Sequence, residues 1–237
     1  IIYQHGDAAN ETLTFYTSDA IKFKLDANSR ISLSNNDTGG TGNTIFGKNA
    51  FDNTVDGSHN NTLIGELSGG TGTQTDTSDN NTGVGYKSLE DLTTGHSNTS
   101  LGVQAGGDIT TGIGNTALGY NALLDSPSVS YAVVVGYDAG KSSMNSGANG
   151  TVAIGASALA ALTTGSRNVA LGYNAGLETT IGISNIAIGY QALVGDGAFQ
   201  NDNNIAIGSS NADGTLGAMG GQWETAASTN NIAIGTG

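Results

Sequence analysis

Residues whose types could support catalysis or metal binding are few and widely spaced in this chain of 237 residues. The histidines His5, His59 and His96 lie in segments rich in glycine, serine, asparagine and aspartate, and their spacing matches no metal triad. There is no cysteine, so the chain has neither thiolate ligands nor disulfides. We therefore predict no metal site, no cofactor and no enzymatic activity.

Two further patterns resemble catalytic or nucleotide-binding motifs without completing them. Gly140, Lys141 and Ser142 resemble the end of a phosphate-binding loop, but residue 135 is valine where that motif has glycine. A glycan hydrolase needs two carboxylates at a fixed separation, and calcium needs a defined ligand spacing. The acids in the predicted loops show neither pattern, so we interpret them as turn residues; examples are Asp76, Asp79, Asp196 and Asp202.

The candidate ligand-binding residue is Trp223, the only tryptophan in the chain. It lies in a long segment, residues 209–230, that also contains Met219 and a pair of glycines. Aromatic side chains on projecting loops stack against sugars and contact protein partners. The alternative is that Trp223 packs over its own part of the chain.

The composition excludes several classes of protein. Glycine accounts for 38 of the 237 residues, yet the single proline and the lack of glycine at every third position exclude collagen. The formal net charge of −13 would repel a polyanion, which excludes nucleic acid as a partner. No apolar run approaches the ~20 residues of a membrane-spanning helix, so we predict no membrane insertion. Because the chain begins at Ile1 and stops at Gly237 within a repeated pattern, we expect a segment of a longer protein.

An internal repeat, most often spaced by 17 residues, defines the elements that hold these side chains. Each unit has an anchor glycine, preceded by a bulky apolar residue and, three positions before the glycine, by a β-branched residue. The residue between them is mostly small, as at Ala117 and Ala153, and this alternation predicts a short strand. The anchors are Gly47, Gly65, Gly85, Gly102, Gly119, Gly136, Gly155, Gly172, Gly189, Gly208 and Gly235.

Other columns of the repeat indicate how the units stack. Asparagine stands four residues before the anchor in nine of eleven units, and stacked asparagines can form a hydrogen-bonded ladder. The anchor glycine fits a corner with positive φ or without room for a Cβ. The residues after it, such as 120–123, predict a second short strand, so that a unit is strand, corner, strand and loop. Four residues after the anchor, large residues alternate with glycine from Phe51 to Leu193, which predicts that each leucine packs over neighbouring glycines.

A unit of this size cannot form its own core, so the units must stack and bury a continuous ridge of leucine, isoleucine and valine. The predicted fold is all-β, a parallel β-solenoid of about eleven coils over residues 41–237. Residues 1–40 do not repeat and are predicted to form a β-rich shaft or connector, with strands at 13–17 and 20–25. A flat parallel ladder favours association between copies.

The repeat resembles those of known fibrous proteins. Asn-Val-Ala-Leu-Gly-Tyr-Asn-Ala at 168–175 and Asn-Ile-Ala-Ile-Gly at 185–189 are similar to the head repeats of YadA-type trimeric autotransporter adhesins. They are even more similar to repeat arrays in bacteriophage tail fibres. The resemblance implies a left-handed β-roll that forms a homotrimer, with the β-branched strand turned toward the trimer interior. The units are longer here than in the adhesin heads.

The function that the resemblance implies is that of a structural tail fibre protein, a rigid trimeric rod for host attachment or receptor display. Residues 21–33 resemble the strand–turn–strand segments of phage fibre shafts, which favours this reading over the alternative, a bacterial adhesin head on the outer surface. The implied location is the virion, outside the cell. The implied partners are further copies of the chain, other tail or fibre components, and a cell-surface glycan or protein receptor.

An ice-binding solenoid is a third class, suggested by the threonines three residues before the first five anchors. An ordered ice-binding face would keep one residue type along its length. The column changes to valine and isoleucine from Val133 onward, which disfavours this class.

Overall fold

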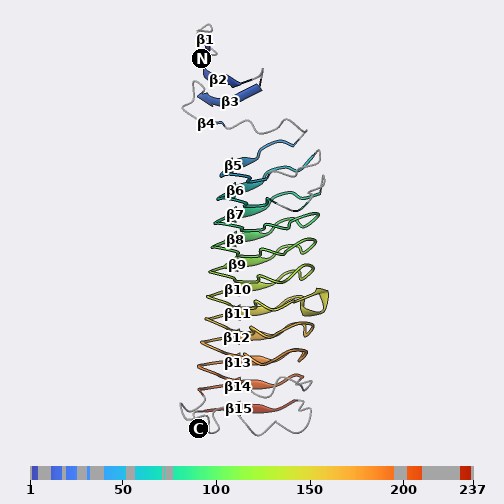
Figure 1. The fold of residues 1–237 in the computed structure, drawn as a ribbon. Helices are drawn as coiled ribbons and strands as arrows, with labels where there is room; N and C mark the ends of the chain where they lie inside the picture. The colour runs from blue at the N-terminus through green and yellow to red at the C-terminus, as the bar shows by residue number, and fades with distance from the viewer. Residues whose placement is uncertain are drawn as a thin grey trace.

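The computed structural model describes residues 2–4, 12–17, 20–25, 31–32, 40–51, 57–70, 72, 77–194, 202–209 and 230–235. These residues are all-β apart from one 3₁₀ turn, η1 (Ser146–Ala148). The strands form two separate sheets, a four-stranded sheet near the N-terminus and an eleven-stranded sheet after it (Figure 1). Outside the described residues lie His5, Asp76, Asp196 and Trp223.

The N-terminal sheet is antiparallel, with its strands in chain order. Thr14 is the pairing partner of Ile2 on one side and of Lys24 on the other. The strands predicted at 13–17 and 20–25 are confirmed. The four strands are β1 (Ile2–Gln4), β2 (Thr12–Thr17), β3 (Ala20–Leu25) and β4 (Ile31–Ser32).

Eleven three-residue strands, each followed directly by an anchor glycine, stack into a single parallel sheet in chain order (Figure 1). They pair in register, so that Val133 of one strand lies between Thr116 and Val152 of its neighbours. The predicted parallel β-solenoid is confirmed. The strands are β5 (Thr44–Phe46), β6 (Thr62–Ile64), β7 (Thr82–Val84), β8 (Thr99–Leu101), β9 (Thr116–Leu118), β10 (Val133–Val135), β11 (Val152–Ile154), β12 (Val169–Leu171), β13 (Ile186–Ile188), β14 (Ile205–Ile207) and β15 (Ile232–Ile234).

The anchor glycines form a column of corners at the ends of these strands. Their φ angles all lie between 128° and 147°, a conformation that is strained for any residue with a Cβ. A Cβ added to Gly119 would also lie 2.5 Å from the carbonyl oxygen of Gly136 in the next coil. Both reasons for glycine at the corner, positive φ and lack of space, are therefore confirmed.

The segment after the anchor glycine is a turn, so the prediction of a second short strand is wrong. Asn121 and Leu123 have φ angles of 52° and 56°, which a strand does not contain. The turns nevertheless stack, because the Asn121 N–H donates to the Val103 carbonyl and the Leu123 N–H to the Ala139 carbonyl, both at 3.0 Å. Each coil is therefore strand, corner, turn and loop.

The predicted asparagine ladder is present in the interior. Asn98 Nδ2 donates to Asn81 Oδ1 at 3.2 Å and to the Gly112 carbonyl at 2.9 Å. Asn98 Oδ1 accepts from the backbone and side-chain nitrogens of Asn115, both at 3.0 Å. The ladder stops where Ala132 follows Asn115 and begins again at Asn168, so it stabilises two stretches of the solenoid.

The core is built from the middle residues of the strands, most of which are small, and from large residues of the turns. Ala117 and Ala153 of the strands, and Leu89 and Leu123 of the turns, are completely buried. The first and third strand residues point outward instead. The predicted buried ridge therefore does not include the leucine, isoleucine and valine residues at those strand positions, because alternation turns only the middle residue of each strand inward.

The predicted packing of leucine over glycine is confirmed for Leu159, whose Cδ2 lies 2.7 Å from the position of a Cβ added to Gly176 in the next coil. At Gly140 the space is taken instead by Met144, whose Cε lies 2.6 Å from such a Cβ. The alternation of large residue and glycine thus fills the core between coils, with a methionine in place of leucine at one level.

Candidate interaction surface

The outer face of the eleven-stranded sheet is uncharged and largely apolar. Because side chains alternate along a strand, the first and third residues of each strand point away from the core. Leu118 is 36% exposed, Leu171 46% and Ile234 73%. None of the strand residues from β5 to β15 is charged.

The composition of this face changes along the solenoid. In β5–β9 the first strand position is threonine, whereas from Val133 of β10 onward it is valine or isoleucine. At the usual strand spacing of ~4.8 Å, eleven strands give a face about 50 Å long. From β10 to β15 both outward positions are apolar, and a large continuous apolar patch on a protein surface marks a contact with another molecule.

A column of exposed tyrosines runs along the edge of this face, because each tyrosine follows an anchor glycine that ends a strand. The rings of Tyr120 and Tyr137 are stacked, with centroids 5.2 Å apart and planes inclined by 10°. Those of Tyr173 and Tyr190 are stacked at 5.5 Å and 11°. Tyrosine side chains in this position offer an apolar ring for contact and a hydroxyl group that can hydrogen-bond to water or to a ligand.

Acidic residues form another column, six residues after successive anchor glycines. Asp91, Asp108 and Asp125 occupy this position in three neighbouring coils, where the Asp108 N–H donates to the Leu124 carbonyl at 3.0 Å. Burial, followed by the negative charges of Asp125 and Asp91, raises the pKa of the Asp108 carboxyl above its ordinary value. The stacking of coils in register therefore places like charges in a row.

The histidines that the structure describes are not brought together. His59 Nδ1 accepts a hydrogen bond from the Thr41 N–H at 2.9 Å, whereas His96 Nδ1 lies 3.3 Å from the hydroxyl of Ser97. Within the described ranges, no group of three or more histidine, aspartate or glutamate side chains is placed to hold a metal ion.

The loop acids that the structure describes bind backbone groups of the preceding coil. Asp79 Oδ1 accepts from the His59 N–H at 2.6 Å, and Asp202 Oδ1 accepts from the Ile183 N–H at 2.8 Å. These carboxylates satisfy peptide N–H groups between coils, as expected for turn residues.

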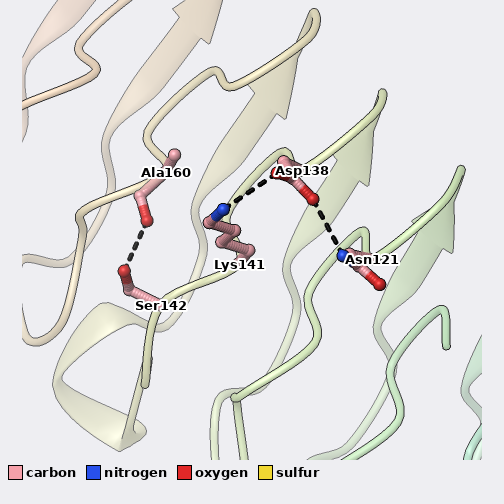
Figure 2. A network of polar contacts seen from close by, with 5 residues as sticks. All are labelled: Asn121, Asp138, Lys141, Ser142 and Ala160. Atoms are coloured by element: carbon pink, nitrogen blue, oxygen red, sulfur yellow. Dashed lines mark hydrogen bonds and ion pairs between the residues drawn. The ribbon is translucent and has the colours of Figure 1, made fainter.

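The segment that resembles a phosphate-binding loop is held by contacts within the solenoid (Figure 2). Lys141 Nζ donates to Asp138 Oδ2 at 2.8 Å, and this hydrogen bond raises the pKa of Lys141. Ser142 Oγ donates to the Ala160 carbonyl of the next coil at 2.5 Å. Because Lys141 neutralises Asp138 and Ser142 joins two coils, both side chains have structural roles here.

The tyrosine and acid columns were not among the residues expected to be functional from the sequence. Both were detectable, because they occupy fixed positions one and six residues after the anchor glycine. The repeat spacing alone does not show that the tyrosine rings stack or that the acids lie close together. Both depend on neighbouring coils that pair in register.

Comparison with family models, curated proteins and solved structures found no match for this chain. In the part of the chain that the structure describes, there is no helix of the length and hydropathy needed to cross a membrane. The repeat and the surfaces it creates are therefore the features that bear on function.

Proposed function

We propose that this chain is a non-enzymatic structural segment of a phage tail fibre, in which three copies associate through their apolar sheet faces. In this proposal the solenoid is a left-handed β-roll and the trimer is a stiff rod of the extracellular virion. The rod attaches to the host cell surface or displays the part that does. Its partners are other tail or fibre components and a cell-surface glycan or protein receptor.

The observation that carries the proposal is the exposed apolar face of the sheet. Burial of this face between copies would contribute about 25 cal/mol for each Å² of apolar surface removed from water. The net charge of −13 belongs to residues outside the solenoid strands, where it would keep assembled rods soluble. The resemblance of the repeats to phage fibre arrays supports three copies around the axis.

Polar side chains that bond between coils support a structural role. Asn98, Asp79 and Asp202 each bond to backbone groups of another coil. Such bonds stiffen the stack, since they satisfy buried N–H and C=O groups that lie between coils. A stiff stack of coils is suited to hold a receptor-binding part at a distance from the virion.

Immunogold electron microscopy with antibodies against this chain tests the proposal on the culture that produces the protein. We expect gold on the tail fibres of free virions. Gold on the outer surface of bacterial cells, with virions unlabelled, would support the alternative of an adhesin head. Label on neither would contradict both functions.

A further inference from the structure

The tyrosine column is interrupted at one position where two ring faces are left uncovered. Tyr120 covers one face of Tyr137, and Tyr190 covers one face of Tyr173. Ala156 occupies the column position in the coil between these two pairs. We call this position, bounded by Tyr137 and Tyr173, the open rung.

The strand register shows that both uncovered faces are turned toward the open rung. Val135, Ile154 and Leu171, each two residues before a column position, are direct partners in β10, β11 and β12. The rings stack along the solenoid axis, so the free faces of Tyr137 and Tyr173 point toward the coil of Ala156. Accordingly, Tyr137 is 57% exposed and Tyr173 51%, against 44% and 46% for their stacked partners.

We propose that the open rung binds one pyranose ring of a neutral glycan, which rests on the two tyrosine faces. This inference builds on the proposed attachment function and assigns a site to it. Two strand spacings separate the rings by about 10 Å. A ring halfway between them would lie about 5 Å from each, within the 4.5–7 Å range of stacked rings.

The polar groups beside the open rung favour a sugar over a purely apolar occupant. Ser157 and Asn174, the residues after Ala156 and Tyr173, are half-buried, and their side chains have no hydrogen-bond partner within the described residues. A hydroxyl and a carboxamide can both donate and accept, as sugar hydroxyls require.

The charge beside the open rung is balanced. Asp138, which follows Tyr137, accepts from Asn121 Nδ2 at 3.0 Å and from Lys141 Nζ at 2.8 Å (Figure 2). The carboxylate is therefore already paired, which favours a neutral sugar over a cationic ligand.

The other interruption of the column differs in shape. Val103 stands between Tyr86 and Tyr120 in the column, and its branched side chain is larger than that of alanine. Ala156 has only a methyl group, so the proposal applies to its level alone.

Saturation-transfer NMR with cellohexaose, maltohexaose and chitohexaose as probes tests the open rung on the full chain. We expect saturation transfer to at least one hexaose and none with Ala156→Tyr, since tyrosine at this position restores the column. Tyr173→Ala should weaken binding by about threefold to tenfold. Tyr190→Ala is the matched control, because it disrupts the same stacked pair but leaves the face of Tyr173 toward the open rung.

Three NMR results would overturn the inference: no transfer to any of the hexaoses, undiminished transfer with Ala156→Tyr, or equal losses with Tyr173→Ala and Tyr190→Ala. A changed light-scattering mass of Ala156→Tyr would assign the open rung to contact between copies and would also overturn it. If the hexaoses do not bind but gold labels the tail fibres, the proposed function stands and only the sugar site is wrong. The two tests are therefore separate.

Discussion

Left-handed backbone conformations at fixed positions explain residue choices that hydropathy alone does not. The residue four positions after the anchor has φ between 48° and 61° wherever the structure describes it, whether it is glycine or a large apolar residue. A residue with a Cβ loses roughly 1–2 kcal/mol in this conformation. Leucine is stable there because it fills the core, so strain and burial oppose each other at the same position.

Substitution of Leu123 tests this balance. Leu123 is completely buried with φ of 56°. Leu123→Ala should cost about 2–5 kcal/mol through the lost contacts and the cavity. Leu123→Gly should cost about 1 kcal/mol less than Leu123→Ala, because glycine relieves the strain. Urea denaturation measures both; a glycine variant less stable than the alanine variant would contradict this account.

The anchor column makes a second prediction at the residue scale. Gly119→Ala should destabilise the chain by at least about 3 kcal/mol, because strain adds to a clash with the Gly136 carbonyl. Gly150→Ala is the matched control: its φ is also positive, at 73°, but an added Cβ would lie 3.9 Å from its nearest neighbour, Arg167 Cγ. We expect a cost of about 1 kcal/mol there. Equal thermal midpoints for the two variants would show that space is unimportant at the anchor.

At the scale of the element, the asparagine ladder joins coils in the buried interior, in addition to their backbone pairing. Within the ladder Asn98 bonds to the coils on both sides, through Asn81 and Asn115. Loss of one ladder asparagine leaves several buried groups without partners, so its effect on the unfolding free energy should exceed that of one hydrogen bond.

Asn98→Ala should therefore lower the unfolding free energy by about 2–4 kcal/mol. Asn80→Gly should change it by less than about 0.5 kcal/mol, because Asn80 is exposed, lies outside the ladder and has a φ of 59° that glycine adopts freely. Similar denaturation midpoints for both variants would mean that the ladder contributes little.

The acid column predicts a pH dependence. Since the pKa of Asp108 is raised in the folded chain, its charged form is disfavoured there, and stability should rise as pH falls through that pKa. Asp108→Asn should then be more stable than the wild type at pH 7. The difference should vanish near the ordinary aspartate pKa of about 3.9. Thermal midpoints from pH 7 to pH 4 measure it; a constant difference would contradict the role of Asp108.

The sequence predicts the strands and the ladder because both follow from repeated spacing. It does not predict the turns, because Tyr-Asn-Ala-Leu at 120–123 alternates as a strand does and the left-handed angles leave no trace in hydropathy. It also does not show which strand face is internal, since alternation is the same in both directions. The open rung follows from the stacking of Tyr137 on Tyr120 and of Tyr173 on Tyr190, which the sequence does not show. Trp223 lies outside the described residues.

At the scale of the whole molecule, the single chain leaves an apolar sheet face exposed. The first and third residues of every strand from β10 to β15 are valine, isoleucine or leucine, and they point outward. A closed assembly would cover this face along its length, whereas an open pairing would leave it available for further association. Three copies around one axis would form a closed rod that does not associate further through this face.

The molar mass in solution, from light scattering coupled to gel filtration, tests this account most directly. Leu171→Lys places a charge on the face and should reduce the mass to that of one chain, while Glu178→Lys in an exposed turn should not. For the wild type, the account predicts three times the chain mass of 23.6 kDa. A wild-type mass of a single chain would contradict it.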